Sequence, residues 1–161
     1  MNTQLPPLRT LQLGNVLVDI FRDLAFRDDK GTLVAYAPDT DSANLRCSVI
    51  SILKNGKEIA GAGESEVREK ADQGGGAVEE RHGKIVFYVV KPSSEDPKST
   101  IHYWYVGMGG HYVIVTLFLD HAYVDDPRSK HVRESVDLLI RSLRRADPVG
   151  TDNGGAAPRR G

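Results

Sequence analysis

Four strand-length stretches in the second half of the chain constrain its fold more than any other feature. They are residues 77–81, 84–91, 101–106 and 111–120, and turn-forming residues join two of the pairs, His82-Gly83 and Gly107-Met108-Gly109-Gly110. Strands that are joined by short turns pair antiparallel with one another. The sequence therefore predicts a four-strand antiparallel meander over residues 77–120.

The second of these stretches, KIVFYVVK, is apolar on both of its faces. Its alternating side chains are Ile85, Phe87 and Val89 on one face, and Val86, Tyr88 and Val90 on the other. Such a strand lies inside a sheet whose two faces are covered, or in a sheet that offers one face to a partner.

The hairpin formed by the last two stretches sorts its aromatic residues by face. With the turn placed at residues 107–110, paired residue numbers sum to 217, so Trp104 faces Val113 and His102 faces Val115. The opposite face, here called the aromatic face, carries four ring side chains: Tyr103, Tyr105, Tyr112 and Phe118. These four are the candidate binding residues, because tyrosine and phenylalanine on a sheet suit a protein interface.

Two helices are predicted to pack on this sheet. Asp126 and Pro127 are a good N-cap and first residue for a C-terminal helix. Its apolar stripe is Val132, Val136, Leu139, Ile140 and Leu143, and basic residues of its last turns are Arg141, Arg144 and Arg145. A shorter helix is predicted over residues 64–72, and both helices are expected to cover one face.

The first half of the chain adds strands at residues 31–38 and 45–53, while residues 15–26 fit either a helix or a strand, with a strand favoured. The predicted fold class is therefore α+β: an antiparallel sheet with a four-strand meander, a C-terminal helix and at least one further short helix. The length suits a single domain, predicted over residues 10–145. Residues 1–9 are an N-terminal extension, and residues 146–161, rich in glycine and proline, a disordered tail.

Composition argues against several classes of partner. The net charge is −1, and no apolar run reaches the ~18 residues of a membrane span. We therefore expect no nucleic-acid or membrane partner, and the absence of a recognisable signal peptide favours a cytoplasmic location. The single cysteine, Cys47, alternates with apolar neighbours and is predicted to be buried and unreactive.

No catalytic or metal-binding motif is present in the sequence. His102 and His111 lie on the order of 13 Å apart in the predicted hairpin, too far to share one metal ion. We therefore predict no metal and no cofactor. Asp120 and His121 are the one candidate acid–base pair, although an Asp-His pair at a strand end commonly forms a turn. They define the alternative function, a small-ligand-binding or hydrolytic domain with a pocket near these residues.

The order of the predicted elements resembles the Mog1/PsbP-like superfamily over residues 10–145. The nearest local similarity is GGHYVIVTLFLD followed by ESVDLLIRSL, which resembles the last strand and helix of that group. The group consists mostly of non-enzymatic binders, including a Ran-GTPase binder, photosystem subunits and bacterial effector chaperones. No shared motif allows binding residues to be carried over to this chain.

The favoured function is therefore non-enzymatic. We expect a bacterial protein-binding module, such as an effector chaperone, adaptor or toxin-neutralising protein, whose partner is another protein or a second copy of itself. The aromatic face is either open to that partner or closed by the N-terminal strands, and the sequence leaves both possibilities standing.

Overall fold

A computed structural model describes residues 7–39 and 43–146. The strands of the main sheet are β3 (Ala25–Asp29), β4 (Thr32–Tyr36), β5 (Ala43–Ser51), β8 (Glu79–Arg81), β9 (Lys84–Pro92), β10 (Ser99–Met108) and β11 (His111–Asp120). Smaller sheets contain β1 (Leu8–Leu13), β2 (Val16–Phe21) and β12 (Arg144–Arg145), and β6 (Leu53–Lys54) and β7 (Lys57–Glu58). The helices are α1 (Ala62–Gln73), α2 (Pro127–Ser142) and the short 3-10 helix η1 (His121–Tyr123). The predicted α+β class is confirmed.

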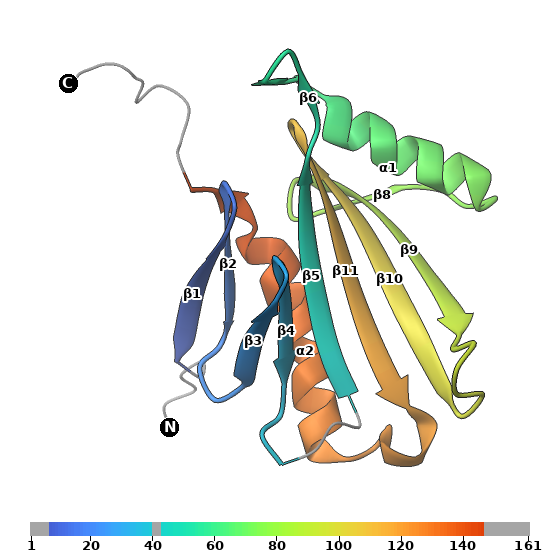
Figure 1. Cartoon of the computed structure of the whole chain (residues 1–161). Helices are drawn as coiled ribbons and strands as arrows, with labels where there is room; N and C mark the ends of the chain where they lie inside the picture. The colour runs from blue at the N-terminus through green and yellow to red at the C-terminus, as the bar shows by residue number, and fades with distance from the viewer. Residues whose placement is uncertain (1–6, 40–42, 147–161) are drawn as a thin grey trace.

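The main sheet is antiparallel, with the strand order β3-β4-β5-β11-β10-β9-β8 (Figure 1). It contains the predicted meander as β8-β9-β10-β11. His82 and Gly83 both have positive φ, 53° and 78°, as a tight hairpin turn requires. Residues 15–26 form β2 and the start of β3, which confirms the favoured strand interpretation.

The predicted register of the β10–β11 hairpin is wrong by two residues. Met108 pairs with His111 and Trp104 with Val115, so only Gly109 and Gly110 form the turn. Gly107 belongs to the strand, where it pairs with Tyr112. A glycine is needed at this position because a Cβ atom there would lie 2.7 Å from the Cα of Glu64 in α1. Since side chains alternate with a period of two, the shift leaves every residue on its predicted face.

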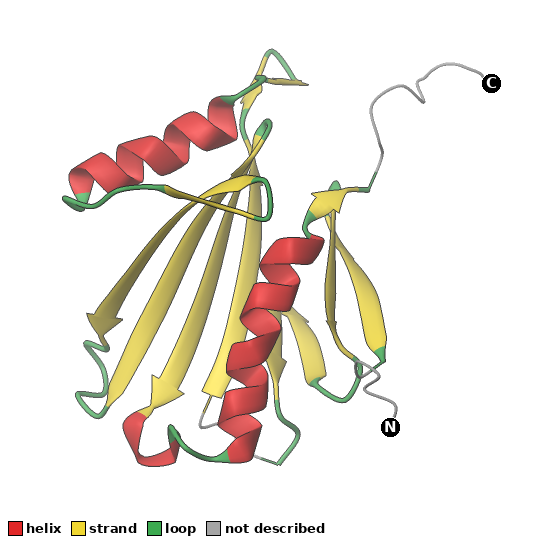
Figure 2. Ribbon diagram, turned by 180° about the vertical axis from the view of Figure 1, so that it is seen from behind, coloured by secondary structure: helices red, strands yellow, loops and turns green. Residues whose placement is uncertain are grey.

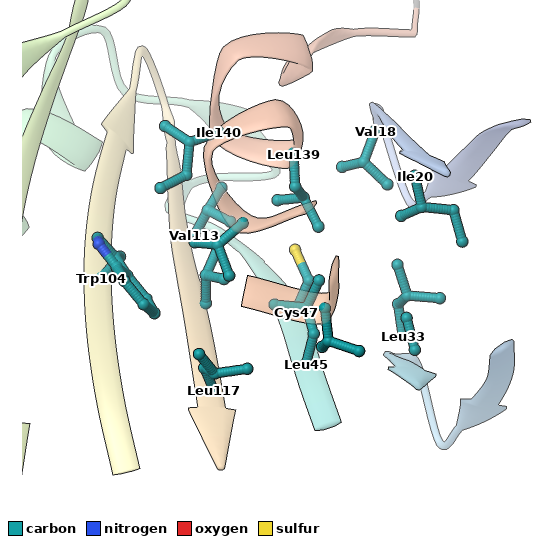
Figure 3. Packing of buried hydrophobic residues seen from close by; sticks show 14 of the residues in the cluster. Val18, Ile20, Leu33, Leu45, Cys47, Trp104, Val113, Leu117, Leu139 and Ile140 are labelled. Atoms are coloured by element: carbon teal, nitrogen blue, oxygen red, sulfur yellow. The ribbon is translucent and has the colours of Figure 1, made fainter. Parts of the chain in front are cut away.

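One face of the main sheet, here called the core face, packs against α2 and the three-stranded sheet of β1, β2 and β12 (Figure 2). Figure 3 shows Leu139 and Ile140 of α2 beside Val113, Trp104 and other buried residues of this face. Cys47 is fully buried here, as predicted, and burial raises the pKa of its thiol to about 12.

The aromatic face packs against α1, so the expectation that both helices cover one face is wrong. Val67 and Ala71 of α1 pack with Phe87 and Tyr112 of the sheet. The approach is close because Gly63 has no side chain: a Cβ atom there would lie 1.9 Å from the carbonyl oxygen of His111. The N-terminal strands lie on the core face and do not close the aromatic face.

The described chain begins with β1 and ends with α2 and β12. Helix α2 begins at Pro127, and Asp126 caps it by accepting from the N–H of Arg128 at 2.8 Å. The helix ends at Ser142. The prediction that Arg144 and Arg145 lie in its last turns is therefore wrong, and the two residues form β12 beside β2. Ala146 donates to the carbonyl of Asn15, and the rest of the predicted tail, residues 147–161, lies outside the described residues. At the other end, β1 already begins at Leu8, within the predicted extension.

Candidate functional site

The structure brings all four predicted ring residues to the aromatic face. Tyr103 and Tyr105 come from β10, and Tyr112 and Phe118 come from β11. The rings of Tyr103, Tyr105 and Tyr112 stack in a row, with centroids 6.0 Å apart and planes within 6° of parallel. The rings therefore turn their faces toward one another along the row.

Helix α1 divides this row into a covered and an uncovered part. Tyr112 is only 5% exposed and belongs to the cluster under α1, so it is a core residue that a partner cannot reach. Its hydroxyl finds no hydrogen-bond partner among the described residues, and burial raises its pKa. Tyr105 is half-buried at the margin of the helix.

The remainder of the face is here called the open half. Its half-buried residues are Tyr36, Val89, Ile101, Tyr103, Thr116 and Phe118. A hollow of about 440 Å³ lies over Tyr36, Asn44 and Phe118, and a smaller one of about 180 Å³ lies between α1 and β9. No described helix or strand packs over this part of the sheet.

Cations surround the open half. The guanidinium carbon of Arg27 lies 5.6 Å from the ring centroid of Tyr36. Lys91 lies 5.3 Å from that of Tyr103, and Lys70 of α1 lies 5.7 Å from that of Tyr105. Within residues 7–39 and 43–146, none of these three cations pairs with a carboxylate.

Sequence reasoning missed these cations. Arg27 reaches the aromatic face only because β3 pairs with β4, and β4 pairs with β5, in a particular register. Lys91 was visible at the end of β9, but its position over Tyr103 depends on the β9–β10 pairing. The alternation of β9 was the one available signal, since it places Lys91 on the same face as Val89.

Asp120 and His121 lie at the end of β11 but do not act together. Asp120 caps η1 by accepting from the N–H of Ala122 at 2.9 Å. The side chain of His121 is exposed, and its backbone N–H donates to the carbonyl of Lys98. The two residues therefore perform the turn role, and this geometry gives no support to an acid–base pocket.

A polar cluster that the sequence did not reveal joins β7, β11 and β12. Arg145 donates to both carboxylate oxygens of Glu58, at 2.6 and 3.2 Å. The fully buried His111 lies 3.6 Å from the same carboxylate. The hydrogen bonds from Arg145, more than the nearby His111, hold the pKa of Glu58 below its usual value. The cluster ties the ends of three sheets together.

The histidines show no metal-binding geometry in the described parts of the chain. His102 lies opposite Leu117, six residues from His111 along β11, and its Nδ1 lies 2.7 Å from the hydroxyl of Tyr88. The described residues contain no group of three or more histidine, cysteine, aspartate or glutamate side chains that could hold a metal ion. They also contain no helix that is long and apolar enough to cross a membrane.

Comparisons with known proteins identify the fold. No family model matches the sequence, and neither does any curated protein. A crystal structure from Bacteroides thetaiotaomicron superposes with a TM-score of 0.65 at 16% identity, covering 87% of this chain. This chain spans only 48% of that protein's length. The solution structure of cyanobacterial PsbP (CyanoP) from Synechocystis superposes with a TM-score of 0.51 at 11% identity, covering 90% of this chain and 96% of that one. The resemblance inferred from the order of elements is thereby confirmed at the level of the fold, which is consistent with a Mog1/PsbP-like fold.

Proposed function

We propose that this protein is a non-enzymatic protein-binding module whose partner docks on the open half of the aromatic face. The observation that carries the proposal is the group of half-buried rings that α1 leaves uncovered: Tyr36, Tyr103 and Phe118. Tyrosine and phenylalanine in such a position bury a large apolar area when a partner docks. An effector chaperone, adaptor or toxin-neutralising protein of bacterial type is the function we propose for this module.

The ring geometry favours a protein over a nucleic acid. Single-stranded nucleic acids stack their bases on open ring faces. Here Tyr103 and Tyr105 already stack on each other, and Lys91 lies over Tyr103. Part of the ring surface is thus already occupied, and aliphatic side chains such as Val89 and Ile101 lie beside the rings, which suits the side chains of a polypeptide.

The partner's charge follows from the cations around the open half. Arg27, Lys70 and Lys91 favour acidic residues in the docked segment, which would steer its approach and orient it. Asp29 is an acidic side chain on the same face, and it lies 4.0 Å from Arg46.

Capture from native lysate tests the proposal when variants are compared. Tyr103→Ser should lose proteins that the wild type retains, because it removes a ring of the open half. Tyr123→Ser is the matched control, since Tyr123 is 48% exposed in η1, outside the aromatic face. Circular dichroism establishes that both variants fold. If Tyr103→Ser and the control retain the same proteins as the wild type, the open half is not the docking surface.

A further inference from the structure

The outer edge of β9 is only partly paired. Strand β8 pairs with β9 at Lys84, Ile85 and Val86. From Phe87 to Pro92, no strand among the described residues lies on the side of β9 away from β10 (Figure 1). In an antiparallel ladder every second residue turns its N–H and C=O groups outward, so this stretch offers unpaired backbone groups to another strand.

The opposite edge of the sheet shows how such an edge is normally protected. Strand β3 carries Arg27, Asp28 and Asp29, whose charges discourage pairing with another chain. Strand β9 has only Lys91 and the terminal Pro92 as comparable protection. It also leaves Tyr88 40% and Val90 43% exposed on the core-face side of the same stretch.

We propose that a second copy of this chain pairs with this edge, β9 against β9, so that one continuous antiparallel sheet runs through a two-fold dimer. This interface uses the backbone edge of β9, whose Val89 and Lys91 also border the open half. Its test does not depend on the proposed function. A closed two-fold contact is the commonest form of homo-oligomer, and it requires that the contact be self-complementary.

Pairing geometry selects one register. Directly opposed residues of antiparallel strands point to the same face of the sheet. The two-fold axis must therefore pass midway between one residue and the same residue of the second copy. An axis at Val89 pairs residues 87–91 with their counterparts and leaves Pro92, which has no N–H, outside the ladder. An axis at Tyr88 would place the partner's Val90 opposite Val86, where Glu79 already pairs.

The side chains match in this register. Tyr88 of each copy lies opposite Val90 of the other, an aromatic and β-branched pair that buries the two most exposed apolar residues of β9. Phe87 lies opposite Lys91, and Val89 lies opposite itself on the axis. No like charges oppose each other, which is the condition that an isologous strand pair must meet.

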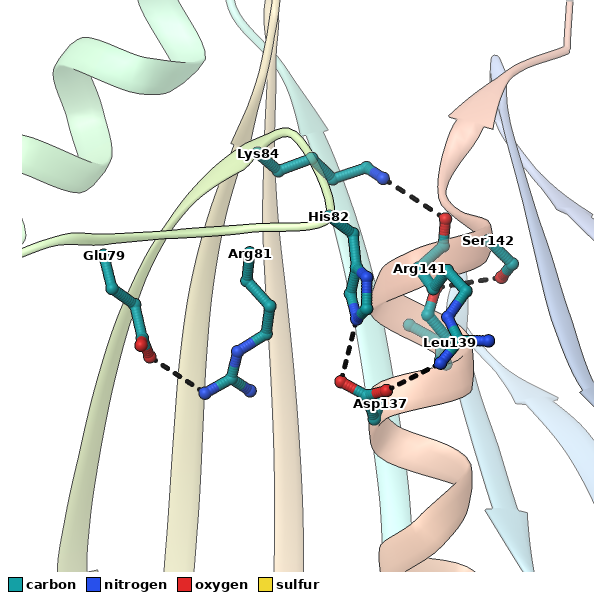
Figure 4. A network of polar contacts seen from close by, with 8 residues as sticks. All are labelled: Glu79, Arg81, His82, Lys84, Asp137, Leu139, Arg141 and Ser142. Carbon is teal, nitrogen blue, oxygen red and sulfur yellow. Dashed lines mark hydrogen bonds and ion pairs between the residues drawn. The ribbon is translucent and has the colours of Figure 1, made fainter.

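Helix α2 holds the β8–β9 hairpin in place, and this hairpin marks where the free edge of β9 begins. The imidazole of His82 lies 2.9 Å from Asp137, and the Lys84 ammonium donates to the carbonyl of Arg141 at 3.3 Å (Figure 4). These contacts fasten the β8–β9 turn to the helix, so β8 blocks the first part of the edge. The second copy is thereby confined to the stretch below Val86.

Crosslinking tests the register directly. Val89→Cys places two thiols opposite each other on the axis, with Cβ atoms about 5 Å apart, and mild oxidation of this variant should give a disulfide-linked dimer. Val90→Cys is the matched control, because its counterpart lies opposite Tyr88 and the crosslink should be lost. The native Cys47 is fully buried and does not compete.

Analytical ultracentrifugation tests the dimer itself. The wild type should sediment as a dimer at tens of micromolar, and Val90→Lys should sediment as a folded monomer. Leu53→Lys alters a still more exposed apolar residue elsewhere, at 54% against 43% for Val90, and should remain dimeric. Tyr103→Ser should also remain dimeric, which separates this interface from the open half.

Three results would overturn the proposal. One is a monomeric wild type across the concentration range. Another is a dimer that survives Val90→Lys without a Val89→Cys crosslink, because a different surface would then hold it. The third is crosslinking through Val90→Cys in preference to Val89→Cys, which would place the axis at Val90.

Discussion

The two faces of the main sheet are covered to different extents. The core face meets α2, of 16 residues, together with the sheet of β1, β2 and β12. The aromatic face meets only α1, of 12 residues, which packs against the part of β9, β10 and β11 nearest the Gly109-Gly110 turn. The core face is therefore closed over β4, β5 and β11, and only its outer part leaves Tyr88 and Val90 of β9 exposed. The aromatic face, in contrast, leaves its whole open half uncovered.

This difference shows that position under a cover, and not residue type, decides the role of each tyrosine. Tyr112 and Tyr103 belong to one stacked row on one face. Tyr112 is core because Val67 and Ala71 pack against it, while Tyr103, beyond the reach of α1, stays half-buried. The loss of stability on truncating each tyrosine of the row should therefore depend on how much of that ring α1 covers.

The largest effect is expected at the covered end. Tyr112→Ala removes a buried ring and should lower the free energy of unfolding by about 3–5 kcal/mol, as other large aromatic truncations do. Urea denaturation measures this loss. Tyr112→Phe is the matched control: its hydroxyl is buried without a hydrogen bond among the described residues, so its removal should be neutral or stabilising. A large loss in the control would mean that the hydroxyl has an essential partner.

The second effect concerns the close packing of α1 against the sheet. Gly63→Ala would push a methyl group into the carbonyl of His111, so the helix must lift from the strand. Overpacking of this kind should cost about 1–3 kcal/mol. Ser65→Ala, on the exposed side of the same helix, should be nearly neutral in the same denaturation experiment. Equal stability of the two variants would show that α1 is not held by this close approach.

The third effect is pH-dependent and lies where the three sheets meet. Because the folded pKa of Glu58 is lowered, its pairing with Arg145 and His111 stabilises the fold above the unfolded pKa of about 4.3. This contribution is lost as pH falls from there through the lower folded pKa. Glu58→Gln should therefore cost about 1–2 kcal/mol at pH 7, and urea melts at falling pH should show the variant and the wild type converging below pH ~4. A constant difference down to pH ~3 would contradict this sign.

Local signals in the sequence were sufficient for most of the fold. Alternating apolar residues marked the strands, His82-Gly83 marked a hairpin, and Asp126-Pro127 marked the start of α2. Gly107 misled the register because glycine is used there for close packing against α1 rather than for a turn. In the sequence, a glycine that allows close packing cannot be distinguished from a glycine that allows a turn until the position of the neighbouring helix is known.

The site was less accessible to sequence reasoning, because its parts come from distant segments. The shared face of Tyr103 and Phe118 follows from alternation alone, and a register error of two residues cannot change it. The place of Arg27 depends on two further strand pairings, and the cluster of Glu58, His111 and Arg145 joins segments more than 30 residues apart. Non-local pairing of this kind has no signature in a single sequence.

The smallest effect on stability is expected at the uncovered end of the tyrosine row. Tyr103→Ala removes a half-exposed ring and its contact with Lys91, which should lower the free energy of unfolding by about 1 kcal/mol or less. Tyr105→Ala, at the margin of α1, should fall between Tyr103→Ala and Tyr112→Ala in the same urea melts. The gradient is the decisive observation, because it measures how far the cover extends along the row. A loss at Tyr103 equal to that at Tyr112 would mean that the ring is core, and the open half would then offer no docking surface.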